Sequence, residues 1–338
     1  MITIGVIGCG HWGPNYVRNF GALAGVTVRV AADVDQNRRT VVERMFPWVK
    51  TAADHRAVLD DPAIDAVVVA TPTGTHFGLV KEALEAGKDV LCEKPLTTTA
   101  AEALELARLA EEKKRILMVG HTFLFNPGIL KLKQLLDEDV AGRVYYLHAE
   151  RTNLGPIRSD VNVVYDLASH DISIFNFLRG ELPGSASAQG GRFLRSTIDD
   201  VSFITLRYAD GVMASILVSW LHPRKVREVT VVGDKKMIIW NDLGVMGPLM
   251  VFDKKVEREP TYLDFGEFHL LTREGDITIP RVNQAEPLRL QCDHFVSCVK
   301  ERSKPRSPAE QGVGVARVLD AINLSISKGG MPCQVQTE

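Results

Sequence analysis

The first 120 residues alternate between short apolar runs and stretches with the spacing of an amphipathic helix. The apolar runs have the length and composition of strands that are buried on both faces of a sheet. They lie at 2–7, 26–32 and 65–70, from 89 to the pair Glu93-Lys94, and at 115–120. Helices are predicted at 15–23, at 76–86 and, after the capping box Thr99-Ala100-Ala101-Glu102, to about Lys114. This alternation predicts a doubly wound parallel sheet.

The second half of the chain has a different pattern. Most of its apolar runs follow one another directly, with turns such as Ala209-Asp210-Gly211 between them, as in an antiparallel sheet. These runs lie at 143–151, 198–208, 212–220, 226–232, 236–240 and 249–252, and helices are predicted at 128–137, 163–179, 287–302 and 308–327. We therefore predict an α/β protein with a Rossmann domain over 1–122 and an α+β domain over 123–338.

Composition narrows the class of protein. The 338 residues include 40 basic and 42 acidic side chains, so nothing offers the positive charge that nucleic acid or an anionic membrane requires. The five cysteines are scattered and never spaced as Cys-x-x-Cys, which argues against a zinc site or a disulfide framework. No apolar run reaches membrane-spanning length, and the first residues lack the pattern of a signal peptide. We expect a cytoplasmic protein that binds no metal.

The first apolar run leads into Gly8-Cys9-Gly10-His11-Trp12-Gly13, which matches G-x-G-x-x-G. Glycines in this pattern permit a tight turn and let backbone N–H groups reach a pyrophosphate at a helix N-terminus. The second strand ends at Asp33, where a carboxylate accepts hydrogen bonds from a ribose diol and repels a 2′-phosphate. The order of these parts predicts NAD rather than NADP, with Arg38 as a further cofactor contact. The alternative is that Asp33 only begins a loop.

Two other strand ends carry candidate residues, since ligands of an open α/β sheet bind outside the carboxyl ends of its strands. The third strand is followed by Thr71-Pro72-Thr73-Gly74-Thr75-His76, which we expect beside the nicotinamide or its ribose. Within it, Thr71, Pro72, Thr73 and His76 are candidate cofactor contacts, although His76 could equally bond the local backbone. The next strand ends at Glu93-Lys94-Pro95, and the proline keeps Lys94 extended at the strand tip.

Together these motifs resemble the Gfo/Idh/MocA oxidoreductases, the family of glucose–fructose oxidoreductase and inositol dehydrogenase. Glu93-Lys94-Pro95 after a strand is the most discriminating of them, and Asp166 with His170 in the second half completes the match. The resemblance implies a C-terminal domain with a large sheet that often mediates oligomers, here a homodimer or homotetramer. It also implies that Glu93 and Lys94 contact the cofactor and that Lys94, Asp166 and His170 serve the reaction.

The residues allow other interpretations of Asp166 and His170. They lie four apart on one face of the predicted helix, together with Ser173, and such a pair is often only a surface contact. They could also be metal ligands, but no third ligand is evident from the spacing. Many relatives have a glycine pair before the aspartate, whereas this chain has Asn162-Val163-Val164-Tyr165, which leaves the shape of the substrate open.

The predicted activity is oxidation of a secondary alcohol on a sugar or cyclitol, or the reverse reduction. An unperturbed histidine titrates near neutral pH, so His170 is the candidate base, and Lys94 would stabilise the developing alkoxide. The polar loop 153–162, with Arg151 and Arg158, offers donors that suit hydroxyls, a carboxylate or a diphosphate. Together with the resemblance to the family branch that acts on nucleotide-linked sugars, it implies a nucleotide-linked sugar as substrate. The candidate substrate residues are Arg151, Asn153, Arg158, Asn162 and Tyr165. The alternative substrate is free myo-inositol or glucose, and the loop arginines could simply be solvated. Another reductive chemistry of the family is the alternative reaction. A non-catalytic NAD-binding protein is the alternative to an enzyme.

Overall fold

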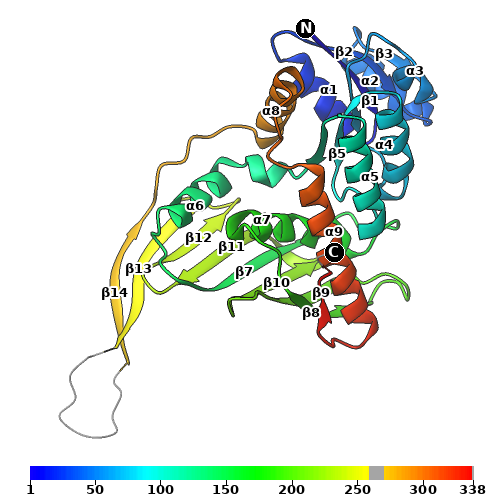
Figure 1. Ribbon diagram of the computed structural model, residues 1–338. Helices are drawn as coiled ribbons and strands as arrows, with labels where there is room; N and C mark the ends of the chain where they lie inside the picture. Colours follow the sequence, from blue (N-terminus) through cyan, green and yellow to red (C-terminus); the bar gives the residue numbers. More distant parts are fainter. Residues whose placement is uncertain (259–269, 337–338) are drawn as a thin grey trace, which may run out of the picture. The chain divides into compact units, whose positions relative to one another are not determined.

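The computed structural model describes residues 1–258 and 270–336, which form two compact units (Figure 1). The first unit contains residues 1–126 and 285–320, and the second contains residues 127–284 and 321–338, less the residues outside the described ranges. Each unit has its own sheet, and each is described by itself below.

The first unit is built on a six-stranded parallel sheet with the order β3-β2-β1-β4-β5-β6. Its centre is strongly apolar, because every side chain of β4 is buried and hydrophobic. The strands are β1 (Ile2–Ile7), β2 (Val26–Ala32), β3 (Lys50–Ala52), β4 (Ala66–Val69), β5 (Asp89–Glu93) and β6 (Leu117–Gly120). The helices are α1 (Gly13–Gly21), α2 (Gln36–Met45), α3 (Arg56–Leu59), α4 (His76–Glu85), α5 (Ala100–Glu112), α8 (Pro287–Glu301) and the first part of α9 (Ala309–Ser327), with 3-10 turns at Thr73–Thr75 and Thr122–Phe125.

The second unit is built on a nine-stranded sheet with the order β14-β13-β12-β11-β7-β10-β9-β8-β15. Neighbouring strands are antiparallel except β7 and β10, and helices α6 and α7 pack against strands β12 and β7. The strands are β7 (Val144–Leu154), β8 (Ser185–Gly191), β9 (Val201–Arg207), β10 (Met213–Ser219), β11 (Leu221–Gly233), β12 (Met237–Asn241), β13 (Leu249–Arg258), β14 (Leu270–Thr278) and β15 (Cys333–Gln334). The helices are α6 (Pro127–Asp137) and α7 (Ser169–Arg179), and a π-helical segment (Val164–Ala168) precedes α7.

The predicted fold class is confirmed: a parallel Rossmann-like sheet is followed by a large, mostly antiparallel one. The grouping of the two closing helices differs from the expected division at residue 123. Helix α8 packs on α1, where Arg18 and Asn19 bond to Glu286 and the rings of Phe20 and Phe295 meet edge to face at 6.3 Å between centroids. These contacts explain why helix α8 belongs to the first unit, and Ala309, Val313 and Ala316 join the first part of α9 to the core of that unit.

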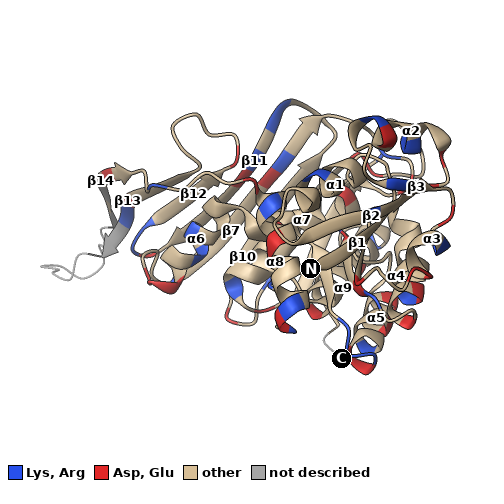
Figure 2. Cartoon of the chain, turned by 90° about the horizontal axis from the view of Figure 1, so that it is seen from above, with Lys and Arg blue, Asp and Glu red and all other residues tan. Residues whose placement is uncertain are grey.

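Charged side chains of both signs are interspersed along the described parts of both units (Figure 2). Helix α2 carries three arginines and a glutamate, and helix α5 carries glutamates and an arginine. Among the described helices, none is both long and apolar enough to cross a membrane.

Candidate functional site

The glycine loop of the first unit is shaped for close approach of a ligand. Gly8 has a φ of +101°, a backbone conformation that side chains disfavour. A Cβ atom on Gly13 would lie 2.0 Å from the carbonyl oxygen of Gly8, so this turn tolerates no side chain there. Gly10 is open, with Arg38 Nη1 as its nearest neighbour at 3.7 Å, and leaves room beside the N-terminus of α1. His11 and Trp12 form an edge-to-face pair on the same loop, and Trp12 is partly exposed.

Asp33 lies at the carboxyl end of β2 beside this loop. Its Oδ2 accepts a hydrogen bond from the Cys9 backbone N–H at 2.7 Å, and its Oδ1 accepts one from Asp35 N–H at 2.9 Å. Arg38 Nη1 lies 3.8 Å from Oδ2. The carboxylate is therefore oriented by the loop that would hold the pyrophosphate, and its oxygens suit as acceptors for the hydroxyls of an NAD ribose.

His76 joins the ends of two neighbouring strands. Its Nε2 lies 2.9 Å from the carbonyl oxygen of Thr71, after β4, and its Nδ1 lies 3.0 Å from that of Pro95, after β5. Thr71 and Thr75 also share a hydroxyl–hydroxyl bond of 2.7 Å, and Thr73 is buried in the 3-10 turn that follows Pro72. His76 therefore bonds the backbone at two strand ends, and a direct contact with the cofactor stays a prediction.

Lys94 directly follows β5, is largely buried and precedes a cis peptide bond to Pro95. The neighbouring Glu93 is also buried. Its Oε1 accepts a bond of 2.7 Å from the Tyr16 hydroxyl, and its Oε2 accepts one of 3.2 Å from the Lys94 N–H. The strand end is thus held on both sides of Lys94, by Tyr16 through Glu93 and by His76 through Pro95.

His121 is a residue that the sequence reasoning missed. Glu93 and Gly120 are paired in the sheet, so Lys94 and His121 each come first after neighbouring strands. The imidazole is fully buried, and neither ring nitrogen has a partner among the described residues. Burial, and then the charge of Lys94, lower the pKa of His121 to about 3, so it is neutral at ordinary pH. The rule that strand ends carry ligand contacts would have found it.

Asp166 of the second unit lies in the π-helical segment, and His170 lies in the first turn of α7. The sequence predicted one regular helix here; π turns of this kind are frequent at functional sites. Trp220 Nε1 donates to Asp166 Oδ2 at 3.0 Å, and Arg158 Nη1 donates to Oδ1 at 3.2 Å. Both oxygens of this carboxylate are oriented. Ser173, which the sequence places on the helix face of Asp166 and His170, donates a hydrogen bond to the backbone carbonyl oxygen of His170.

The five candidate substrate residues have different surroundings. Arg151 is buried and donates three bonds of 2.8 to 3.2 Å to Asp171. Arg158 also bonds both oxygens of Asp160. Asn162 accepts from the Tyr165 N–H at 3.1 Å and donates to Asn323 at 3.0 Å, while Asn153 lies near the end of β7. The sequence did not reveal the structural contacts of Arg151, Arg158 and Asn162.

Comparisons with known proteins agree with these features. Residues 2–121 match the model of an oxidoreductase family with an NAD-binding Rossmann fold, and residues 129–239 match the C-terminal domain of the same family. Inositol 2-dehydrogenase 2 of Saccharopolyspora erythraea is 32% identical over 222 residues, 64% of this chain and 66% of the relative. UDP-N-acetylglucosamine 3-dehydrogenase of Acidithiobacillus ferrooxidans is 32% identical over 249 residues, 70% of this chain and 71% of the relative.

A solved structure gives the same result for nearly the whole chain. A putative oxidoreductase from Magnetospirillum magnetotacticum is 29% identical with a TM-score of 0.81, over 95% of this chain and 99% of that one. The match to the first inositol dehydrogenase spans just under two thirds of that relative's length. The predicted NAD-binding Rossmann domain is confirmed. On these motifs, folds and relatives, the chain belongs to the Gfo/Idh/MocA family of oxidoreductases.

Proposed function

We propose that the protein is an NAD-dependent dehydrogenase that oxidises a secondary alcohol of a sugar or cyclitol, or reduces the corresponding ketone. The proposal rests on the carboxyl end of β5 in an NAD-binding domain. There Glu93 is hydrogen-bonded to Tyr16 and Pro95 to His76, so the backbone is fixed on both sides of Lys94. An ammonium group held at that position suits an oxygen that gains negative charge.

NAD, when bound, supplies a hydride acceptor at nicotinamide C4. In oxidation the carbinol C–H bond breaks with its electron pair, and the hydroxyl proton passes to an imidazole nitrogen of His170. Lys94 donates a hydrogen bond to the same oxygen and stabilises its developing charge. Asp166, already oriented by Trp220 and Arg158, holds the substrate. Reduction uses the same groups in the opposite direction.

We consider two substrate classes. A nucleotide-linked sugar, such as a UDP-N-acetyl sugar or its acid, is our first candidate, and the relative from Acidithiobacillus ferrooxidans acts on such a compound by its name. A free cyclitol or sugar is the second. It is favoured by the engagement of Arg151 and Arg158 with carboxylates, because fewer cationic N–H groups are then left for a diphosphate.

The test is the rate of NAD reduction with UDP-N-acetylglucosamine, its uronic acid, myo-inositol and glucose. We expect kcat/KM to be at least tenfold higher for a UDP-linked compound, roughly the discrimination that one or two extra polar contacts provide. A higher kcat/KM for myo-inositol or glucose would establish the second class. Turnover of none of the four would contradict the proposed substrate classes.

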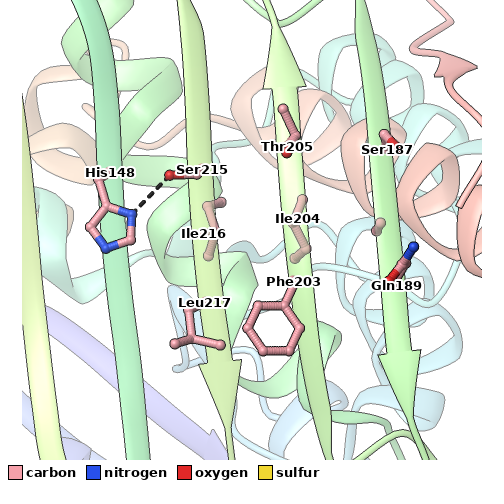
Figure 3. Close-up of a pocket in the computed structure, with 10 residues that line it drawn as sticks. His148, Ser187, Gln189, Phe203, Ile204, Thr205, Ser215, Ile216 and Leu217 are labelled. Carbon is pink, nitrogen blue, oxygen red and sulfur yellow. Dashed lines mark hydrogen bonds between the residues drawn. The ribbon is translucent and has the colours of Figure 1, made fainter.

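We also propose that the protein forms a homodimer or homotetramer through the face of the large sheet opposite α6 and α7. Alternate residues of β7, β9 and β10 point to that face, and Phe203 is 61% exposed and Tyr146 46% exposed. These strands and β8 line a hollow of about 480 Å³. Figure 3 shows side chains that line it, among them Phe203, Leu217 and His148, which bonds Ser215 at 2.8 Å. Exposed aromatic side chains around such a hollow are typical of protein–protein contacts.

Light scattering after size exclusion tests this assembly. We expect the Phe203→Glu variant to shift the protein to a smaller species, since burying an unpaired carboxylate opposes association. Trp48→Glu is the matched control, because Trp48 is a similarly exposed aromatic side chain in the first unit. A monomeric wild-type protein, or an unchanged mass for Phe203→Glu, would refute the proposal.

A further inference from the structure

Tyr16 is a fully buried residue of α1 that bonds directly to the strand end carrying Lys94. Its hydroxyl donates to Glu93 Oε1 at 2.7 Å, and the other oxygen of Glu93 accepts from the Lys94 N–H at 3.2 Å. One carboxylate therefore joins the helix that follows the glycine loop to the backbone of Lys94. No motif or comparison assigns a role to Tyr16.

Gln291 of α8 fixes the direction of these bonds. Its side-chain N–H donates to the Tyr16 oxygen at 3.1 Å, so the phenol proton is directed to Glu93. Burial, and then the negative charge of Glu93, raise the pKa of Tyr16 well above its ordinary value. The phenol thus remains a donor over the whole working range of pH.

Helix α8 is itself firmly held on α1. Arg18 donates two bonds to Glu286 at the N-terminus of α8, and Asn19 donates a third at 3.1 Å. Arg18 is the main cause of the lowered pKa of Glu286, which keeps that carboxylate charged. Phe20 and Phe295, each four residues after Tyr16 and Gln291 on their helices, pack edge to face. Gln291 is thus presented to Tyr16 from a helix with little freedom to shift.

A glycine on the neighbouring strand completes the arrangement. A Cβ atom on Gly120 would meet the Cα atom of Glu93 at 3.2 Å and the Tyr16 hydroxyl at 3.3 Å. Both distances are tighter than ordinary contacts, so β6 makes room for the Tyr16–Glu93 bond.

We propose that Tyr16 and Gln291 are positioning residues that act on catalysis through Glu93 and the backbone of Lys94. They orient the Glu93 carboxylate, and that carboxylate accepts a hydrogen bond from the Lys94 backbone N–H. The direction in which the Lys94 side chain extends from the end of β5 is thereby fixed. This inference rests on the proposed function, in which the Lys94 amine donates to the reacting oxygen. Small displacements of a catalytic group lower kcat more than they lower binding.

The first test compares single-hydroxyl deletions in the full-length protein. With whichever of UDP-N-acetylglucosamine, its uronic acid, myo-inositol and glucose is turned over, we expect Tyr16→Phe to lower kcat about 10- to 100-fold and to leave KM and the Kd of NAD within about twofold. Gln291→Leu should lower kcat less, because Tyr16 keeps its bond to Glu93. Tyr208→Phe is the matched control, since the Tyr208 hydroxyl is buried and has no partner among the described residues. Its kcat should equal that of the wild type.

A second readout does not depend on activity. Hydrogen exchange of the Lys94 amide, followed by NMR on the NAD-bound protein, should be at least tenfold faster in Tyr16→Phe and unchanged in Tyr208→Phe. The inference is overturned if Tyr16→Phe keeps the wild-type kcat or the wild-type exchange of Lys94. It is also overturned if Tyr16→Phe loses NAD affinity as strongly as kcat, which would indicate general damage. If none of the four compounds is turned over, the proposed function fails and the exchange result alone decides.

Discussion

Replacement of Lys94 or of His170 by alanine is expected to lower kcat on the order of 10²- to 10⁴-fold, while the Kd of NAD stays within about twofold of the wild-type value. Lys94 lies at the carboxyl end of β5, but the glycine loop and Asp33 are built by β1, β2 and α1. In the proposed mechanism, loss of the amine removes a donor to the reacting oxygen and leaves the glycine loop and Asp33 unchanged. Steady-state rates and titration of the protein with NAD provide the two measurements.

A second buried lysine, at the other end of β5, offers a control. Lys88 precedes β5, and its ammonium group donates to the carbonyl oxygens of Asp61 and Ile64, each at 2.8 Å. Lys88→Met should therefore lower the free energy of unfolding and leave kcat within about threefold. A Lys94→Ala or His170→Ala variant that retains more than one tenth of the wild-type kcat would contradict the assigned roles.

The Rossmann half of the fold could be predicted closely because its strands are continuous apolar runs. The predicted and observed ends of β1 and β2 coincide, and Thr99 caps α5 as its capping box predicts. Helix α2 was missed because only Val42 among its residues is buried, so it has almost no apolar face to detect. The central strands of a sheet can therefore be predicted from hydrophobicity alone, whereas helices that cover the edge of the sheet, such as α2, cannot.

The π-helical segment shows a second limit. Five residues of π geometry cannot be distinguished from an α-helix by apolar spacing, since the two periods diverge by less than one residue over a single turn. The predicted helix at 163–179 thus covered the right residues with the wrong local geometry. This matters because Asp166 lies inside that segment.

Candidate residues could be predicted where a local rule names them, and not where a long-range contact does. The strand-end rule singles out Asp33 and Lys94 without knowledge of the fold. The partners that hold them are distant in sequence: Tyr16 lies 77 residues from Glu93. Trp220 lies 54 residues from Asp166, and no pattern in the sequence around Trp220 predicts a hydrogen bond to a carboxylate. Such partners become visible only when the chain is folded.

The buried ion pair between Arg151 and Asp171 should give the largest single effect on stability. Arg151 points to the helix-covered face of β7, and its guanidinium donates to both oxygens of Asp171 in the first turn of α7. Both side chains are almost completely buried, at 4% and 1% exposure. Arg151→Met leaves a buried carboxylate without this partner, and we expect it to lower the free energy of unfolding by about 3–5 kcal/mol.

The double variant separates the ion pair from the burial of a lone charge. Asp171→Leu combined with Arg151→Met removes both charges, so most of the lost stability should return. Urea unfolding followed by tryptophan fluorescence suits the measurement, because the buried Trp220 and Trp240 both report on the second unit. Lys235→Met breaks an exposed pair with Asp139 and should leave the free energy of unfolding almost unchanged. If the double variant is no more stable than Arg151→Met, the cost arises from lost packing around β7 and α7 rather than from an unpaired carboxylate.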